Sequence, residues 1–265
     1  MNKYMNNYNL SNQVILVTGA AGYLGQEIVS QLIKLGARVI CADTSLKILR
    51  EVSTKNNWGE NAYLINFDIS KENKVKKSFS IAIEKFGLIN SIVNNAGLSI
   101  FEPWTKRKDK DFNDVMAVNL KGTFYCMREF FNHLKKKKHQ GVVVNIASHY
   151  GVISPDPRIY IDNKLRNSEI YGATKAGVIQ MTKYFAVNAP EEGLKVRVNA
   201  IAPGGIYNKT NPQDKQFVKN YSKKCPMKRM AEVEEIVGPI LFLLSKDSSY
   251  INGHTIIVDG GMSSW

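Results

Sequence analysis

Two tyrosines in this chain are each followed, four residues later, by a lysine: Tyr160 by Lys164 and Tyr171 by Lys175. Within a helix such residues share one face and lie one turn apart. An ammonium about 4 Å from a phenolate stabilises it by roughly 4 kcal/mol at an effective dielectric of about 20. This is sufficient to bring a phenol from its ordinary pKa of about 10 close to neutrality. A tyrosine and lysine so placed can act as a general acid and base.

The sequence around the two pairs distinguishes them. A chain with 12 tyrosines and 36 lysines and arginines contains about one or two such pairs by chance, so the spacing alone is weak evidence. The residues after Tyr171, Gly172–Val178, open a long amphipathic pattern that is typical of a helix. The residues after Lys164 have no helical apolar stripe. These surroundings favour Tyr171 and Lys175 as the reactive pair.

Short apolar segments alternate with longer segments of helical periodicity, and these elements must position the pair. The expected strands are Val14–Thr18, Arg38–Ala42, Ala62–Phe67, Ile89–Asn94, Val142–Ala147, Val196–Ile201 and Thr255–Val258. The expected helices include Leu24–Leu35, Glu72–Phe86, Asp111–Leu134, Ala173–Asn188 and Val233–Leu244. Almost continuously apolar strands indicate a parallel sheet that is covered on both faces. We therefore predict an α/β fold: a single doubly wound Rossmann-type domain over residues 1–265, with a parallel sheet of about seven strands and helices on both faces.

A glycine-rich turn follows the first expected strand. Gly19, Gly22 and Gly25 lie between that strand and the next helical segment, which is the setting of a dinucleotide-binding fingerprint. Glycine permits a tight turn and a close approach of the backbone to a pyrophosphate, while the amides of the helix N-terminus favour its negative charge. The turn therefore predicts a dinucleotide cofactor.

Asp43 follows the second expected strand, 24 residues after Gly19. A carboxylate near that offset can accept hydrogen bonds from both hydroxyls of the adenosine ribose, and it would repel a 2′-phosphate. No arginine occurs at residues 20–23 or 44–46 to bind such a phosphate. These observations favour NAD over NADP. A role for Asp43 as a helix N-cap is equally consistent with its position.

Further short motifs occur in the order, and on the elements, expected of one family. They are Asp68 after the third strand, Asn94–Gly97 after the fourth, Arg197–Gly204 in the sixth strand and its turn, and Ile251–Gly253 with Val258–Gly261 near the C-terminus. On these motifs the chain resembles the single-domain type of the short-chain dehydrogenase/reductase family over nearly its whole length. It departs from the family pattern TGxxxGxG at Tyr23, where glycine is usual. That glycine spacing is similar to the spacing in the longer epimerases and dehydratases, which lack the C-terminal signature.

The resemblance implies an NAD-dependent oxidoreductase that transfers hydride between a nicotinamide and a secondary alcohol or ketone. It implies four catalytic residues: Tyr171 exchanging the proton, Lys175 assisting it and binding the nicotinamide ribose, Ser148 holding the substrate oxygen, and Asn119 supporting a proton-relaying water. It also implies which residues bind the cofactor: Gly19, Gly22, Tyr23, Leu24, Asp43, Asp68, Ile69, Asn95, Ala96, Gly97, Tyr171, Lys175, Pro203, Gly204 and Ile206. No metal ion is expected.

The distances that are usual in the family favour a different tyrosine depending on the motif from which they are counted. Tyr160 lies 12 residues after Ser148, which is close to the usual separation, whereas Tyr171 lies at the usual distance before Arg197–Gly204. We choose Tyr171, so that residues of about 158–167 become an insertion. This insertion, together with the sequence that starts at Ser148 and runs to Asp156, resembles short-chain oxidoreductases of bacterial flagellin and surface-glycan modification, of the legionaminic acid pathway type.

The segment of about residues 205–230 corresponds to the family's mobile substrate lid, and it is polar and basic. With the basic residues of the insertion, it suggests a small-molecule substrate that is anionic or sugar-like, although solvated surface charge explains these residues equally well. The narrower resemblance favours a sugar or sugar derivative. The alternatives are a 3-oxoacyl-carrier-protein reductase and, in another class, a non-catalytic dinucleotide-sensing protein.

Composition sets limits on location and partners. The net charge is +13, but no nucleic-acid motif or basic stripe with interleaved aromatics accompanies it, so no nucleic-acid partner is expected. The apolar runs are too short to cross a bilayer, and the N-terminus does not resemble a signal peptide. Three cysteines without a CxxC pair suit a reducing cytoplasmic setting. The family resemblance implies a homo-oligomer, a tetramer or a dimer.

Overall fold

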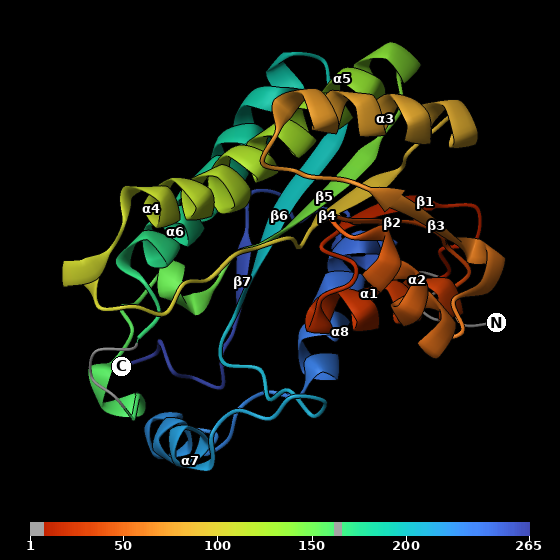
Figure 1. Ribbon diagram of the computed structural model, residues 1–265. Helices are drawn as coiled ribbons and strands as arrows, with labels where there is room; N and C mark the ends of the chain where they lie inside the picture. Colours follow the sequence, from red (N-terminus) through yellow and green to blue (C-terminus); the bar gives the residue numbers. More distant parts are fainter. Residues whose placement is uncertain (1–7, 162–165) are drawn as a thin grey trace.

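The computed structural model describes residues 8–161 and 166–265, and within them seven parallel strands form a single sheet (Figure 1). The strands are β1 (Val14–Thr18), β2 (Arg38–Asp43), β3 (Ala62–Asn66), β4 (Ser91–Asn94), β5 (Gly141–Ile146), β6 (Val196–Pro203) and β7 (Thr255–Val258). Their order in the sheet is β3-β2-β1-β4-β5-β6-β7. Because the order reverses between β1 and β4, the carboxyl ends of these strands flank the crevice in which such sheets bind ligands.

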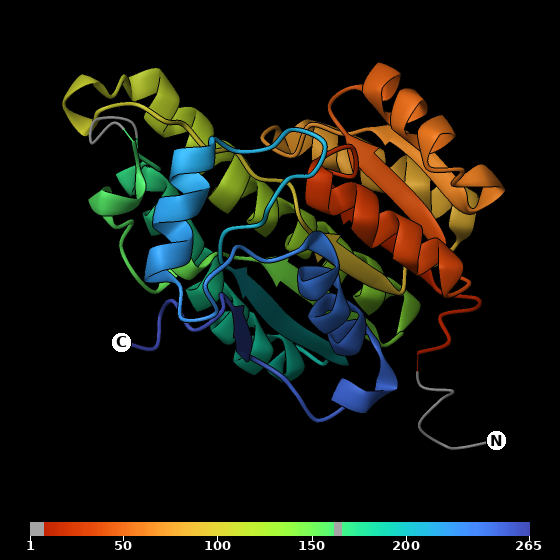
Figure 2. The ribbon, with the colours of Figure 1, turned by 90° about the horizontal axis from the view of Figure 1, so that it is seen from below.

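Helices cover both faces of this sheet. They are α1 (Tyr23–Lys34), α2 (Leu46–Lys55), α3 (Glu72–Phe86), α4 (Asp109–Val115), α5 (Thr123–Lys137), α6 (Glu169–Glu191), α7 (Lys215–Lys224) and α8 (Val233–Leu244). Figure 1 shows α3, α5 and α6 on one face, and Figure 2 shows α1 and α8 side by side on the other. The predicted α/β fold and its Rossmann-type sheet are therefore confirmed.

Alternation along the strands produces two hydrophobic cores. Leu16 of β1 packs with Phe79 of α3 and Phe130 of α5 in one core. Its neighbours Ile15 and Val17 belong to the other core, with residues of α1, α2 and α8. Successive strand side chains point to opposite faces, so a strand that is apolar throughout can fill both cores at once.

Some helical expectations differ from the structure. The helix expected over Asp111–Leu134 is instead α4, a π-helical segment over Met116–Gly122, and α5. The interpretation of Asp43 as a helix N-cap is wrong, because Ser45 caps α2 through a hydrogen bond from the amide of Ile48 to its side chain. The polar segment of about 205–230 contains α7.

The proposed insertion packs against α7. The ring of Tyr160 packs against that of Phe217 in a tilted arrangement with centroids 5.6 Å apart, and the side-chain amide of Asn220 donates to the carbonyl of Ile159 at 3.3 Å. Residues 162–165, including Lys164, lie outside the described part of the chain. Ile159 and Tyr160 of the insertion thus share a small apolar core with the segment interpreted as a lid, and this core includes Tyr221.

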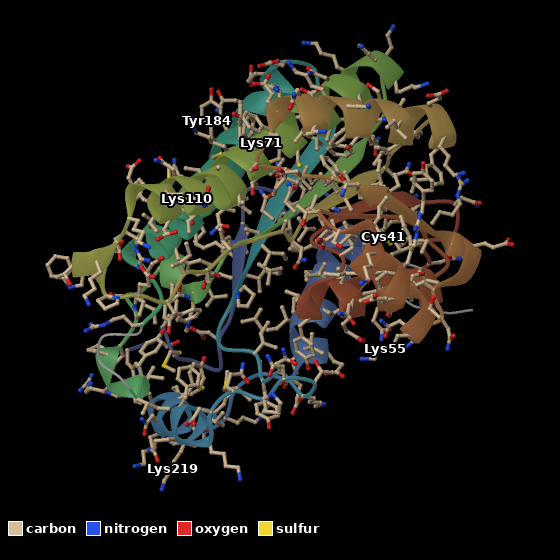
Figure 3. All side chains as sticks on the ribbon, in the orientation of Figure 1. Cys41, Lys55, Lys71, Lys110, Tyr184 and Lys219 are labelled. Carbon is tan, nitrogen blue, oxygen red and sulfur yellow. The ribbon has the colours of Figure 1, made fainter. Side chains whose placement is uncertain are left out.

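The basic residues are spread over the molecule. Figure 3 shows Lys55, Lys110 and Lys219 at the periphery of three separate parts, on α2, α4 and α7. Across residues 8–161 and 166–265, no helix combines the length and the apolar sequence needed to span a bilayer. In the same residues, no three His, Cys, Asp or Glu side chains gather as a metal site would require.

Candidate active site

The glycine-rich turn after β1 is locked to the turn after β4. Gly19 adopts φ +65°, and a methyl group on it would lie 2.8 Å from Cα of Ala96. The side-chain amide of Asn95 donates to the carbonyls of Thr18 and Gly19 at 3.0 Å each. The Thr18 hydroxyl accepts hydrogen bonds from the amides of Asn95 and Ala96 at 3.1 Å. The sequence therefore needs glycine at position 19, and Asn95 holds the turn in place.

Asp43 lies at the end of β2 beside this turn. One carboxylate oxygen accepts a hydrogen bond from the amide of Ala21 at 3.0 Å, and the other accepts one from the amide of Thr44 at 2.8 Å. Asp68, after β3, is similarly fixed because its carboxylate accepts from the amide and hydroxyl of Ser70. Both carboxylates border the same cavity.

That cavity has a volume of about 410 Å³ and lies over the carboxyl ends of β1, β2 and β3. It is lined by Gly19, Gly22, Tyr23, Leu24, Gly25, Asp43, Thr44, Phe67, Asp68, Ile69, Asn95, Ala96, Gly97, Leu98 and Val118. No lysine or arginine occurs among these described lining residues. The cavity suits the adenosine and pyrophosphate of a dinucleotide, and its charge disfavours a further phosphate on the ribose.

A second cavity of about 250 Å³ continues from the first, with which it shares Leu24, Asn95, Gly97 and Leu98. It is further lined by Ser99, Ile146, Ala147, Ser148, Tyr171, Lys175, Pro203, Gly204 and Ile206. All fifteen residues expected at the cofactor site therefore line one cavity or the other. Tyr171, Lys175 and Ser148 meet in the second cavity, where chemistry on a bound substrate would take place.

The start of α6 positions Tyr171 and Lys175. The hydroxyl of Ser168 caps the helix and accepts the amide of Tyr171 at 3.2 Å. One turn later, Nζ of Lys175 lies 5.6 Å from the centre of the Tyr171 ring and donates to the carbonyl of Ile146 at 2.7 Å. The lysine is buried, and this burial lowers its pKa to about 8. The two side chains share the helix face that the spacing predicts.

Lys175 alone does not lower the pKa of the Tyr171 phenol, and the lowered pKa that we expect from Lys175 together with the positive charge of a bound nicotinamide stays a prediction. Burial raises its pKa, and a hydrogen bond with Ser148 only partly offsets this effect. The ammonium of Lys175 is directed at the carbonyl of Ile146 rather than at the phenol oxygen. A tyrosine and lysine one turn apart therefore do not by themselves acidify the phenol, because desolvation of the phenolate outweighs the attraction.

Ser148 follows β5 in extended backbone, and its hydroxyl accepts the amide of Tyr150 at 3.1 Å. Ser148 and Tyr171 both line the second cavity, so two hydroxyl-bearing side chains border the same space. Such a pair can hold a single substrate oxygen from two directions. The position of Ser148 is therefore consistent with its expected role.

Asn119 lies in the π-helical segment between α4 and α5. Its side-chain oxygen accepts the amide of Leu98 at 2.7 Å, while its side-chain nitrogen donates to the carbonyl of Leu98 at 3.0 Å and to the hydroxyl of Thr174 at 3.2 Å. Asn119 does not line either cavity, but a methyl group at Gly97 would lie 3.7 Å from its oxygen and 3.6 Å from Nζ of Lys175. Its side chain ties the loop after β4 to the catalytic helix.

The competing tyrosine, Tyr160, lies elsewhere. Its hydroxyl is 3.0 Å from the hydroxyl of Tyr150, and it does not border the two cavities described above. Its sequence partner Lys164 lies outside the described residues. Geometry therefore favours Tyr171 and Lys175 over this pair.

The role of Thr18 and the contact that Tyr23, an expected cofactor residue, makes with a distant segment were not predicted from the sequence. Thr18 organises the turn after β4, and the TG dipeptide at the end of the first strand could have indicated it. Tyr23, the departure from the family pattern, accepts a hydrogen bond from the backbone amide of Lys209 at 3.3 Å. This contact joins the start of α1 to the segment after β6, and no local motif predicts it.

Comparison with known proteins shows similarity along almost the whole chain. A protein-family model described as Enoyl-(Acyl carrier protein) reductase matches residues 19–263. Glucose 1-dehydrogenase 2 of Bacillus subtilis is 31% identical over 96% of this chain and 96% of its own. The 3-oxoacyl-[acyl-carrier-protein] reductase FabG of Staphylococcus epidermidis is 31% identical over 95% of this chain and 99% of its own.

A solved structure is similar in fold and sequence. The crystal structure of a short chain dehydrogenase from Leptospira borgpetersenii serovar Hardjo-bovis with bound NAD+ matches with a TM-score of 0.86 and 33% identity. The match covers 99% of this chain and 96% of that chain. The sheet, the crevice and the motifs around it thus have counterparts in proteins of the same length.

Proposed function

Because the chain belongs to the short-chain dehydrogenase/reductase family and is an oxidoreductase acting on CH–OH groups, we propose that it transfers hydride between NAD and a secondary alcohol or ketone of a sugar or sugar derivative. The observation that carries this proposal is the meeting of Tyr171, Lys175 and Ser148 in a cavity that continues into the glycine-lined cavity. Acid–base groups and a dinucleotide site in one crevice are what such a reaction requires.

The residues of the crevice fit a nicotinamide dinucleotide. Gly19 and Gly22 keep the turn free of side chains where a pyrophosphate would approach the backbone. Asp43 would accept hydrogen bonds from the adenosine ribose, and Lys175 would donate to the nicotinamide ribose. When bound, the nicotinamide supplies or accepts the hydride.

The side chains of the second cavity would move the proton. Tyr171 accepts the hydroxyl proton when an alcohol is oxidised and donates one when a ketone is reduced, while Ser148 holds the same oxygen. Because burial raises the pKa of Tyr171, its phenol carries a proton at neutral pH. The protonated phenol of Tyr171 can therefore donate a proton to a ketone at neutral pH. This supports ketone reduction at neutral pH and alcohol oxidation at higher pH.

The proposed preference for NAD rests on charge. Asp43 is fixed by backbone amides at the ribose end of the first cavity, and the described lining there holds no cation. A 2′-phosphate would meet this carboxylate without compensation. The alternative function, reduction of a 3-oxoacyl group on a carrier protein, is supported by the relative from Staphylococcus epidermidis and by a net charge of +13 that suits an acidic partner.

A substrate and cofactor screen tests the proposal. Purified protein is assayed with NAD+ and NADP+ against hexoses, disaccharides and hydroxy acids, and with NADH and NADPH against an acetoacetyl thioester, by absorbance of the reduced nicotinamide. We expect sugar turnover linked to NAD, and none in Tyr171→Phe. Turnover confined to the thioester with NADPH would instead establish the alternative function.

We also propose a homo-oligomer in the cytoplasm, formed through α5 and α6. Tyr184 and Val187 of α6 are large apolar side chains that are more than half exposed, and Figure 3 shows Tyr184 at the outer edge of the helices. Apolar side chains gathered on one helix are typical of association surfaces. Light scattering of Val187→Asp beside the unaltered protein measures the mass, and equal masses in the two would argue against this surface.

The three cysteines are buried and unpaired, in keeping with a reducing compartment.

A further inference from the structure

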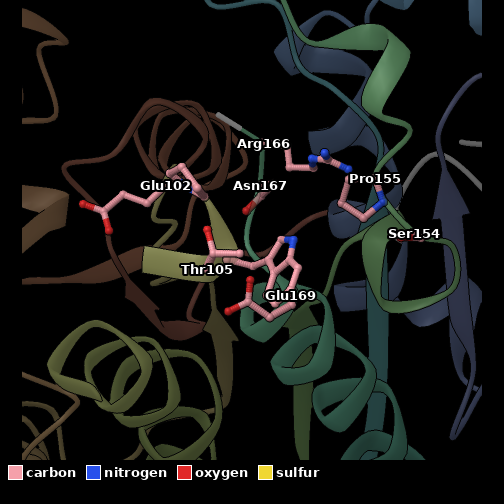
Figure 4. A pocket seen from close by; sticks show the side chains of 9 residues that line it. Glu102, Thr105, Ser154, Pro155, Arg166, Asn167 and Glu169 are labelled. Atoms are coloured by element: carbon pink, nitrogen blue, oxygen red, sulfur yellow. The ribbon is translucent and has the colours of Figure 1, made fainter. Parts of the chain in front are cut away.

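A third cavity, of about 300 Å³, lies beside the catalytic cavity and shares no described lining residue with it (Figure 4). It is lined by Glu102, Pro103, Trp104, Thr105, Ser154, Pro155, Arg166, Asn167 and Glu169. One hydrogen bond links the linings of the two cavities: the hydroxyl of Ser99, which lines the catalytic cavity, donates to the side-chain oxygen of Asn167 at 3.2 Å. Because the linings are in contact, a substrate larger than the catalytic cavity would extend toward this outer pocket.

Two carboxylates of the outer pocket are fixed from beneath by one buried cation. The side chain of Arg107 is only 7% exposed, and its Nε lies 3.2 Å from Glu169 while its Nη1 lies 3.9 Å from Glu102. Each carboxylate offers about four acceptor positions, so these contacts leave further acceptor positions on two residues that line the pocket. The pocket thus presents positioned hydrogen-bond acceptors.

The remaining lining balances the charge of the carboxylates. Figure 4 shows Arg166 and Pro155 on one side of the pocket, with Thr105 and Glu169 opposite. Two guanidinium groups, of Arg166 and Arg107, match the two carboxylates, so the pocket has little net charge. An anionic group would meet both carboxylates, and an acyl chain would have to desolvate them without gaining a hydrogen bond. This lining favours an uncharged group rich in hydroxyls.

Trp104 supplies the apolar part of the pocket. Its side chain is 71% exposed although it is the largest apolar side chain of the loop after β4. The face of an indole ring carries partial negative charge and attracts the weakly positive C–H groups of a ligand. A sugar ring presents C–H groups on one face and hydroxyls around its edge, which matches an aromatic surface surrounded by acceptors.

We propose that the outer pocket binds a second, non-reacting sugar ring of the substrate. The ring packs one face on Trp104 and donates hydroxyl hydrogen bonds to Glu102 and Glu169, while the reacting ring lies at Tyr171. This inference rests on the proposed function and adds to it that the substrate is larger than a single hexose. The residues around Arg166 and Asn167, at the end of the insertion, then help to select the substrate.

Kinetics of Trp104→Ala test this pocket, with D-glucose and a set of glucose disaccharides as substrates and NAD+ as oxidant. We expect disaccharides to lose at least tenfold in kcat/KM, almost entirely through KM, while D-glucose changes less than twofold. Glu169→Gln keeps the size of the side chain and should raise the disaccharide KM with kcat retained. Trp265→Ala removes an indole that is 79% exposed outside the pocket and should change neither substrate.

The outcomes separate this inference from the proposed function. Equal losses for glucose and disaccharides in Trp104→Ala, or wild-type turnover of glucose but of no disaccharide, would overturn the outer pocket while leaving sugar oxidation intact. If no sugar is oxidised, the proposed function fails. A binding measurement then tests whether the outer pocket still takes up a sugar ring. Titration of Trp265→Phe with methyl β-D-glucoside should then still change the fluorescence of Trp104, and the absence of any change would exclude a sugar site.

Discussion

The dinucleotide half of the crevice and its substrate half are built by different means. On the dinucleotide side, turns at the ends of neighbouring strands are held to each other, as where the side-chain amide of Asn95 donates to the carbonyls of Thr18 and Gly19. On the substrate side, side chains from distant segments meet, as where Lys224 of α7 lies 3.2 Å from Asp156. The first half is fixed by the sheet, and the second by contacts between loops.

This difference explains how one scaffold can serve many substrates. Loops can change their side chains without disturbing strands, whereas a change at the end of β1 disturbs the sheet and the cofactor site together. Tyr171 and Lys175 lie on α6 where the two halves meet, and their cavity shares four lining residues with the dinucleotide cavity. The comparison can be tested by changing one residue of each half and of the junction.

Removing the phenol oxygen at the junction has the largest expected effect. Tyr171→Phe should reduce kcat by about 10²–10⁴-fold, the usual contribution of a general acid or base. Dinucleotide affinity, measured by calorimetry, should be almost unchanged because the first cavity is untouched. The control Tyr160→Phe removes a hydroxyl that lies 3.0 Å from the hydroxyl of Tyr150 and outside the two cavities, and it should keep most of the turnover. Greater damage from the control would place the chemistry in the substrate half.

The sequence predicted the dinucleotide half well for a physical reason. All seven strands lie within two residues of their expected limits, since a buried parallel strand is a short, continuous apolar run with polar turns on either side. Most of the expected cofactor residues lie in the turns that follow these strands, whereas Tyr171 and Lys175 lie on α6. Gly19 and Asn95 were therefore found together with their strands, because the carboxyl ends of parallel strands meet at one edge.

The substrate half and the electrostatics could not be predicted in the same way. The pocket around Trp104 gathers three segments whose approach depends on long-range packing. The π-helical segment that carries Asn119 leaves the apolar periodicity almost unchanged, so it was expected to be ordinary helix. The raised pKa of Tyr171 depends on burial, which a spacing of four residues does not report.

Burial of the cation at the junction makes stability depend on pH. Burial lowers the pKa of Lys175 from 10.5 to about 8. Between these values the unfolded chain binds the proton that the folded protein releases, so stability rises with pH. Lys175→Met has no such proton to release. The free energy of unfolding of this variant minus that of the unaltered protein, both measured with urea, should therefore fall by about 3 kcal/mol from pH 8 to 10.5.

The matched control for this pH effect is Lys183→Met on the exposed side of the same helix. Its difference from the unaltered protein should stay constant over that range. The two variants share every buried tyrosine, so ionisation of those groups cancels in the comparison. A constant difference for Lys175→Met as well would mean that the lysine is hydrated and that the junction is open to water.

A methyl group on the turn after β1 should separate cofactor binding from general strain. Gly19 and Gly59 both have positive φ, +65° and +60°, but only at Gly19 would the methyl group approach another atom closely, Cα of Ala96 at 2.8 Å. Each substitution by alanine carries a strain of about 1–2 kcal/mol. Gly19→Ala should in addition weaken NAD affinity by about 2 kcal/mol, roughly thirtyfold, because the turn must move. Equal NAD affinities in the two variants would show that the turn tolerates movement.

The smallest effect is expected from a single charge at the far end of the dinucleotide half. Asp43→Asn keeps the size of the side chain and removes its charge, and its single amide oxygen can accept from only one of the amides of Ala21 and Thr44. The amide no longer repels a 2′-phosphate, so the ratio of kcat/KM with NAD to that with NADP should fall about tenfold, or 1.4 kcal/mol. Asp68→Asn alters a carboxylate at the same cavity, on the side expected to meet the adenine. Because adenine is common to both cofactors, this variant should weaken both equally. If the ratio of kcat/KM values is unchanged in Asp43→Asn, the turn between Gly19 and Gly22 selects the cofactor and the carboxylate does not. The dinucleotide half of the crevice would then distinguish cofactors by its shape rather than by its charge.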